Sequence, residues 1–213
     1  MASRFKWKTS YRFYRGGFRV ARALFGIFYR FDIKGREKIP QGAAMVCSNH
    51  SSVIDPIFVA FAFGADYFLH FIAKIELFRT PVISMFVTKL GAISVDRGMA
   101  DITTIKNSLS YLKAGEKVAI FPEGARVIGD EAIAAKTGAV KIAERAAVPI
   151  IPAYVPRRKR LFSKIHLVIG DPYYIEKAES KRSAEDYMQL SDELMEKIEG
   201  LNPLRSAAGE DNT

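Results

Sequence analysis

The residues best suited to chemistry in this sequence are a histidine and an aspartate five positions apart. His50 and Asp55 form an H-x4-D pattern within the segment 48–55. If a loop brings the two side chains together, the carboxylate fixes the imidazole tautomer and stabilises its protonated form. This is two-thirds of a Ser-His-Asp arrangement, and a hydroxyl of the substrate is the candidate for the missing nucleophile. A structural interpretation is also open, in which His50 stabilises the loop and Asp55 caps the next helix.

A second candidate site follows an apolar segment and reads Phe-Pro-Glu-Gly-Ala-Arg over residues 121–126. Gly124 lets the backbone approach a ligand closely. Arg126 can bind a phosphate through two parallel hydrogen bonds. Glu123 is placed to orient a substrate hydroxyl or to hold Arg126. The alternative is a Glu–Arg surface pair on a turn.

Two further cations are candidates for binding an anionic substrate. Arg97 follows the predicted strand at 91–95, and Lys74 lies in the segment 73–77. Each of them also fits a solvated surface position, so neither identifies a site alone.

Several other kinds of active site are not indicated. The sequence has no G-x-S-x-G, Walker-type or G-x-G-x-x-G motif, which argues against a serine hydrolase and against the common nucleotide-binding loops. His70 and His166 lack partners at ligand spacing, so no metal centre is expected. Cys47 is the only cysteine, so no internal disulfide can form and a reducing compartment is expected; its apolar surroundings predict a core position.

The candidate residues are separated by alternating strand and helix patterns. Strands are predicted at 31–34, 43–48, 91–95, 117–121, 149–155 and 165–169, and helices from 55, at 101–115, at 139–147 and at 184–201. This alternation predicts an α/β fold with a mostly parallel, mixed sheet flanked by helices. In such sheets chemistry collects after the carboxyl ends of strands, which fits the loops 49–55 and 122–126. Pro149 and Pro152 predict an edge or irregular position for their strand.

The first 30 residues hold eight basic residues and no acidic one, out of a net charge of +9 for the chain. At helical spacing a basic stripe lies beside an apolar, mostly aromatic one; the first holds Arg4, Lys8, Arg12, Arg15, Arg19, Arg22 and Arg30, and the second Trp7, Tyr14, Phe18, Ala21, Phe25 and Phe28. A helix in the plane of a membrane, a helix packed on its own domain and a nucleic-acid arm all fit this pattern. Gly16 and Gly17 are candidates for splitting the helix in two.

The length of 213 residues suits one compact domain, and the 49% hydrophobic content excludes a disordered chain. The longest apolar runs are too short to cross a bilayer, and arginines interrupt any signal-peptide core. The protein is therefore expected to stay inside the cell.

Taken in order, four segments resemble the conserved blocks of the lysophosphatidate (1-acylglycerol-3-phosphate) acyltransferase family. Residues 49–55 resemble its N-H-x4-D block, 91–97 a second block that ends in arginine, 121–126 the F-P-E-G-T-R block, and 148–152 the V-P-x-x-P block. The resemblance covers about residues 31–170. One departure concerns the third block, where the family's threonine is Ala125 and its frequent later serine is Val127. A hydroxyl beside the phosphate site is thereby lost.

The resemblance implies that the hydroxyl of lysophosphatidate attacks an acyl thioester, of CoA or of acyl carrier protein, with no further cofactor. His50 is then the base and Asp55 its support; Arg126, Arg97 and Lys74 would bind the phosphate, with Glu123 and Gly124 at the acceptor. A sister enzyme acting on glycerol 3-phosphate or another lysophospholipid, and a non-catalytic membrane- or nucleic-acid-binding relative, remain alternatives.

The resemblance also favours the membrane interpretation of the N-terminal segment. It implies a peripheral or monotopic protein on the cytoplasmic face of an anionic membrane, with no nucleic-acid partner. The expected organisation is a membrane-interface helical segment at 1–30, an acyltransferase domain at 31–202 and a flexible tail at 203–213.

Overall fold

A computed structural model describes residues 11–95, 102–124, 136–176, 178 and 180–204. The helices are α1 (Tyr11–Phe28), α2 (Asp55–Phe63), α3 (Pro81–Lys89), α4 (Ile102–Lys113), α5 (Gly138–Ala146) and α6 (Ala184–Gly200), with short 3-10 turns η1 (Arg36–Lys38) and η2 (Ile75–Phe78). The strands are β1 (Arg30–Lys34), β2 (Ala44–Ser48), β3 (Leu69–Lys74), β4 (Ile93–Val95), β5 (Lys117–Ile120), β6 (Ile150–Tyr154) and β7 (Lys164–Ile169).

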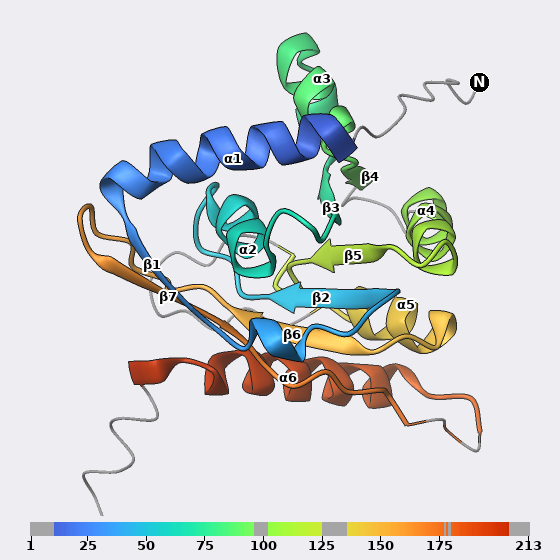
Figure 1. The fold of residues 1–213 in the computed structure, drawn as a ribbon. Coiled ribbons are helices and arrows are strands. Elements are labelled where there is room, and N and C mark those ends of the chain that lie inside the picture. The colour runs from blue at the N-terminus through green and yellow to red at the C-terminus, as the bar shows by residue number, and fades with distance from the viewer. Residues whose placement is uncertain (1–10, 96–101, 125–135, 177, 179, 205–213) are drawn as a thin grey trace, which may run out of the picture.

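The seven strands form one mixed sheet in the order β1-β7-β6-β2-β5-β3-β4 (Figure 1). The neighbouring pairs are parallel except β6 and β7, which are antiparallel. The predicted α/β fold with a mostly parallel, mixed sheet is therefore confirmed. Because β1 and β7 run against the other five strands, the start of β1 and the start of β7 lie at the same edge as the carboxyl ends of β2, β5 and β6.

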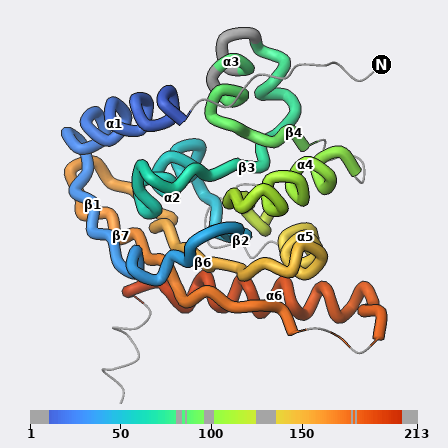
Figure 2. The backbone as a smooth tube through the Cα atoms, turned by 45° about the vertical axis from the view of Figure 1, so that its right-hand side comes forward, coloured from blue at the N-terminus to red at the C-terminus, as the bar shows by residue number. Residues whose placement is uncertain are grey.

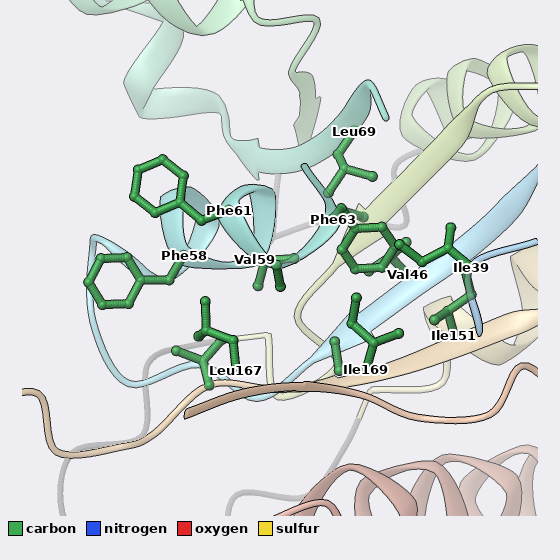
Figure 3. Packing of buried hydrophobic residues seen from close by; sticks show 14 of the residues in the cluster. Ile39, Val46, Phe58, Val59, Phe61, Phe63, Leu69, Ile151, Leu167 and Ile169 are labelled. Atoms are coloured by element: carbon green, nitrogen blue, oxygen red, sulfur yellow. The ribbon is translucent and has the colours of Figure 1, made fainter. Parts of the chain in front are cut away.

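Helices cover both faces of the sheet, which is why β2 is buried along its whole length (Figures 1 and 2). On one face Val46 belongs to a cluster that also holds Phe58, Phe61 and Phe63 of α2 and Leu167 and Ile169 of β7 (Figure 3). On the other face Met45 and Cys47 pack with residues of α4, α5 and α6. Cys47 is fully buried, as its apolar surroundings predict.

The edge position expected for the strand with two prolines is wrong. β6 lies inside the sheet, and Pro152 pairs in register with Cys47 of β2. Its carbonyl accepts from the Gly170 amide at 2.8 Å, so Pro152 turns its polar backbone toward β7. The backbone nitrogen of Pro152 faces the same way as its carbonyl, so the missing N–H interrupts no bond to β2. On the β7 side it falls just outside the β6–β7 ladder, which begins at Ala153.

The apolar stripe of α1 packs on the protein. Phe18 and Phe25 contact the Phe61 ring edge-on, with centroids 5.4 and 5.9 Å apart, and the Tyr14 hydroxyl donates to the Tyr67 carbonyl at 3.0 Å. These three rings therefore pack on the protein, where the membrane interpretation would bury them in lipid, whereas Phe28 at the end of the stripe is exposed. Arg22 of the basic stripe also packs, with its guanidinium 4.3 Å from the centre of the Phe31 ring. Trp7 lies outside the described residues.

The split expected at Gly16 and Gly17 does not occur, since α1 runs unbroken from Tyr11 to Phe28. Tyr14 and Phe18 anchor the helix on either side of the two glycines. Tertiary packing thus outweighs the low helix propensity of glycine.

A buried histidine lies beside the β4 end of the sheet. The His70 side chain is 1% exposed, and its Nδ1 lies 2.8 Å from the Gly91 carbonyl oxygen. Its ring stacks on Tyr111 with centroids 3.7 Å apart. Gly91 has φ 68°, and a Cβ there would lie 2.7 Å from His70 Nδ1. Burial lowers the pKa of His70 below its ordinary value.

Stability is expected to fall in mild acid because of His70. Below a pH of about 6.5 the unfolded chain binds a proton that the folded protein excludes, so the free energy of unfolding falls by up to about 1.4 kcal/mol per pH unit. Urea unfolding of the wild type and of His70→Gln between pH 5 and pH 8 measures the effect. The difference in the free energy of unfolding between the two proteins should change below pH 6.5. A difference that stays constant with pH would contradict the burial of a neutral His70.

Candidate active site

His50 and Asp55 meet in the turn that joins β2 to α2. The His50 Nδ1 lies 3.0 Å from Asp55 Oδ2, although five residues separate them. Asp55 is the first residue of α2 and Pro56 the second, so the start of the helix fixes the position of the Asp55 carboxylate. The His50 ring stacks on Phe121 with centroids 4.1 Å apart and planes 18° from parallel. The imidazole is therefore held both at its edge and on its face, with Nε2 as the remaining ring nitrogen.

The Asp55 carboxylate is buried among donors. Oδ2 accepts from the amides of Ser51 at 2.6 Å and Ser52 at 2.7 Å, and Oδ1 lies 2.8 Å from the Lys159 ammonium. Burial alone would raise the pKa of Asp55, but the His50 bond, the Lys159 charge and the backbone amides outweigh it and lower the pKa. Asp55 is therefore ionised at neutral pH.

Asn49 fixes the end of β2 to the end of β6. Its Nδ2 donates to the Val155 carbonyl at 2.7 Å, and its Oδ1 accepts from the Val155 amide at 2.9 Å. The side chain is fully buried and is thus satisfied by one backbone unit. These two hydrogen bonds set the position of His50, the next residue, relative to the segment that follows β6.

Glu123 supports the same loop from β5. Its Oε2 accepts from the His50 amide at 2.9 Å, and its Oε1 accepts from Arg157 at 2.9 Å. Arg157 also binds Glu199 of α6 at 2.5 Å. Burial raises the pKa of Glu123 against the opposing effect of Arg157. Both oxygens are thus engaged within the protein, and contact of Glu123 with an acceptor stays a prediction.

The other sequence candidates follow strands that end at this edge of the sheet. Lys74 is the exposed last residue of β3. Gly124 lies four residues past the end of β5, with φ 67°, a conformation that favours glycine. Arg97 and Arg126 lie outside the described residues, as does Ala125. The structure therefore brings His50, Asp55 and Glu123 into contact, while the phosphate-binding role of the three cations stays a prediction.

Two residues of the site were missed from the sequence. Arg157 and Lys159 belong to a basic run, Arg-Arg-Lys-Arg at 157–160, which begins three residues past the end of β6. The rule that chemistry collects after the carboxyl ends of strands applies to this loop as it does to the loops after β2 and β5. The signal was thus a cation-rich segment after a predicted strand.

Among the described parts of the chain, no group of three or more His, Cys, Asp or Glu side chains is arranged to hold a metal ion. Within the same residues, no helix is both long and apolar enough to cross a bilayer.

Comparison with known proteins finds a family model and relatives that are all named as acyltransferases. The family model described as Acyltransferase matches residues 30–156. The 1-acyl-sn-glycerol-3-phosphate acyltransferase of Bacillus subtilis is 31% identical over 90% of this chain and 96% of its own. The chloroplastic 1-acyl-sn-glycerol-3-phosphate acyltransferase BAT2 of Brassica napus is 32% identical over 59% of this chain and 37% of its own.

A solved structure shares the fold. The crystal structure of the 1-acyl-sn-glycerophosphate (LPA) acyltransferase PlsC from Thermotoga maritima has a TM-score of 0.66 and 22% identity, over 92% of this chain and 79% of that one. The family match spans all of the strands that carry the His50, Asp55 and Glu123 cluster. The chain belongs to the acyltransferase family, among the 1-acyl-sn-glycerol-3-phosphate acyltransferases.

Proposed function

We propose that this protein transfers a fatty acyl group from an acyl thioester to the free hydroxyl of lysophosphatidate, giving phosphatidate. The observation that carries the proposal is the His50–Asp55 pair at 3.0 Å, in a chain whose relatives are named for this activity. Asp55 is buried and ionised, and His50 keeps one ring nitrogen clear of it.

His50 acts as the general base in this proposal. Its Nδ1 carries the proton that is donated to Asp55, so Nε2 has the lone pair that takes the proton of the acceptor hydroxyl. The acceptor oxygen attacks the thioester carbonyl carbon, forming a C–O bond and an oxyanion. Collapse of this intermediate breaks the C–S bond, and the departing thiolate takes the proton back from His50. Asp55 stabilises the imidazolium between the two steps.

The acceptor phosphate is bound by cations at the same edge of the sheet. Arg126, Arg97 and Lys74 fill this role, since the strands before them, β5, β4 and β3, are parallel and end on the side of His50. Arg126 offers a planar, two-pronged donor for a phosphate. Gly124 lets the backbone come close to the acceptor. The donor is acyl-CoA or acyl-acyl carrier protein, and no other cofactor is required.

An acceptor panel tests the reaction. Purified protein with palmitoyl-CoA should release thiol with lysophosphatidate and form phosphatidate. If thiol release instead needs glycerol 3-phosphate or another lysophospholipid, the protein is the sister enzyme, an alternative that Ala125 favours by removing a hydroxyl from the phosphate block. If no acceptor supports release, with either CoA or acyl carrier protein as carrier, the chain is a non-catalytic relative.

The lipid acceptor places the protein at a membrane in this proposal. Residues 1–30 form the membrane-interface segment and 31–202 the acyltransferase domain, while the tail expected at 203–213 lies, from residue 205 on, outside the described residues. The cationic side of α1 binds the anionic, cytoplasmic surface, so that the protein is peripheral or monotopic and takes no nucleic acid. Support comes from Arg12, Arg15 and Arg19, which are exposed on one side of α1, although Arg15 also lies 3.3 Å from Asp66.

Charge reversal on α1 should weaken vesicle binding. Each cation near an anionic bilayer contributes about 1 kcal/mol, so Arg12→Glu with Arg19→Glu should lower binding by at least about thirtyfold. Co-sedimentation with phosphatidylglycerol vesicles measures the loss, which should diminish in high salt. The matched control is Lys113→Glu with Arg145→Glu, the same change of charge on exposed residues of α4 and α5. Equal binding of the two double variants would contradict the proposed orientation.

A further inference from the structure

The turn between β6 and β7 exposes two large apolar side chains. Leu161 is 62% exposed and Phe162 71%. Together they leave in water the kind of surface that a folded chain normally buries, and they are adjacent in sequence. Exposed apolar side chains that gather with others mark interaction sites.

The backbone of this turn is held in a defined shape. Phe162 has φ 61°, a conformation that an aromatic residue rarely adopts. Its amide donates to the Phe28 carbonyl at 2.6 Å, and the Ser163 hydroxyl donates to the Arg160 carbonyl at 2.6 Å. Such backbone strain persists where surrounding contacts impose it and is often found at functional sites. The turn therefore presents Leu161 and Phe162 outward as a fixed tip.

This tip is continuous with an exposed apolar strip on α1. Val20, Leu24 and Ile27 are each more than half exposed, and at about 100° per residue they fall within about 60° on the helix. The exposed face of α1 has Arg15 along one border and these three side chains along the other. They also point away from the rings that pack on α2. Phe28 ends the strip, and its ring lies 6.1 Å from that of Phe162, centre to centre. Figures 1 and 2 both show the end of α1 beside the β6–β7 turn.

The surface around the tip is cationic. Side chains alternate along the segment after β6, so that Arg157 and Lys159 turn inward to the site while Arg158 and Arg160 are exposed. Within the described residues, neither Arg158 nor Arg160 forms an ion pair with a carboxylate. Neither 11–30 nor 155–164 contains an acidic residue. Exposed apolar groups flanked by unpaired cations suit the boundary between acyl chains and anionic headgroups.

The same segment lies against Asp55, the support of the proposed base. Lys159, three residues before Phe162, contacts Asp55 at 2.8 Å and donates to Ser51 Oγ at 3.0 Å. The start of β7 and the end of α1 are at the edge of the sheet where β2 ends. A bilayer seated on the tip would therefore lie at the His50 side of the protein.

We infer that Leu161 and Phe162, with Val20, Leu24, Ile27 and Phe28, form one surface that inserts into an anionic phospholipid bilayer and turns the His50 edge toward the lipid. The inference rests on the proposed function, in which the acceptor is a lipid. It adds a second inserting element, far from α1 in the sequence, and on α1 it assigns contact to Val20, Leu24 and Ile27, which lie outside the apolar stripe, and to Phe28, the exposed last ring of that stripe. The apolar tip favours a bilayer over an acidic carrier protein.

A fluorescent reporter tests the insertion directly. Trp7 is the only tryptophan of the chain, so Trp7→Phe with Phe162→Trp yields a single reporter on the tip. On addition of phosphatidylglycerol vesicles its emission should shift to the blue and be quenched by lipids brominated on the acyl chains. The matched control is Tyr174→Trp in the same background, since Tyr174 is 66% exposed and follows the other end of β7. That reporter should not respond.

Three results would overturn the inference. They are an unchanged tip reporter on protein that sediments with vesicles, no sedimentation at all, or equal responses of the two reporters. A tip reporter that responds to acyl carrier protein but not to vesicles would likewise overturn it and identify a carrier-protein surface.

Activity assays separate this inference from the reaction itself. Leu161→Ser with Phe162→Ser should lower vesicle binding by about tenfold or more, and should slow transfer to vesicle-embedded lysophosphatidate. Transfer to a short-chain, water-soluble lysophosphatidate should be unchanged, and the control Met188→Ser on α6 should alter neither. Equal rates of the wild type and the tip variant on vesicles would overturn the inference. If neither acceptor is acylated by the wild type, the proposed reaction fails, while the fluorescence result still decides the membrane surface.

Discussion

Replacing His50 with alanine should slow acyl transfer to lysophosphatidate by about 10² to 10⁴, the usual contribution of a positioned general base. The structure gives the reason, because the ring is fixed by Asp55 at 3.0 Å and by Phe121 on its face. No other histidine of the chain contacts Asp55, since His70 is buried beside Gly91 and His166 pairs with Asp32. Steady-state rates of thiol release at saturating donor and acceptor measure the loss.

The control for this variant is His166→Ala. His166 lies 2.8 Å from Asp32 in the β1–β7 pair, so the control also removes a histidine bound to an aspartate, but one outside the site. Its rate should match that of the wild type. An active His50→Ala protein, or a loss of the same size in both variants, would remove His50 from the mechanism.

Replacing Asp55 with asparagine should damage both the reaction and the fold. The amide would no longer impose the tautomer of His50, and the corresponding change in a Ser-His-Asp triad costs about 10⁴ in rate. Lys159, whose side chain is only 5% exposed, would lose the carboxylate that pairs with its charge. Breaking one partner of a buried ion pair destabilises by about 3 to 5 kcal/mol. Urea unfolding and thiol release measure the two effects.

A double-mutant cycle separates these effects. Lys159→Met alone leaves Asp55 without the cation that lowers its pKa, so ionisation of Asp55, and with it activity, should be lost at a higher pH than in the wild type. Asp55→Asn with Lys159→Met removes both charges and should regain much of the stability lost by Asp55→Asn. Activity should not return with it. Recovery of activity in the double variant would show that Asp55 serves the fold alone.

The sheet and the His50 loop could be predicted because their signals are local. A buried strand, a polar loop and an Asp-Pro helix start follow one another from residue 44 to 56, and the structure has β2, the His50 turn and α2 in that order. The contact between His50 and Asp55 needed only that this short loop fold back.

The remaining features depend on contacts between distant residues. Pro152 is tolerated inside the sheet only because its backbone turns toward a gap in the β6–β7 ladder, and no local pattern reports that gap. The apolar stripe of α1 is equally suited to lipid and to α2. It packs on α2 because Phe58 and Phe61, far along the chain, contact its rings.

Lys159 was missed for a related reason. It lies 104 positions from Asp55 in the sequence, and a basic run alone reads as a solvated surface. Half of the run is solvated, since Arg158 and Arg160 point outward. Only the position of the β6 end, fixed by Asn49 on Val155, shows which cations turn inward.

In the proposed reaction the acceptor hydroxyl, and no group of the protein, attacks the thioester. Rapid mixing with palmitoyl-CoA alone, followed by measurement of free thiol and of the intact mass of the protein, tests it most directly. We expect no thiol release and no gain in mass until lysophosphatidate is added, and then release that matches the phosphatidate formed. One equivalent of thiol released without acceptor, with an acyl group retained on the protein, would contradict the account and identify a nucleophile on the chain.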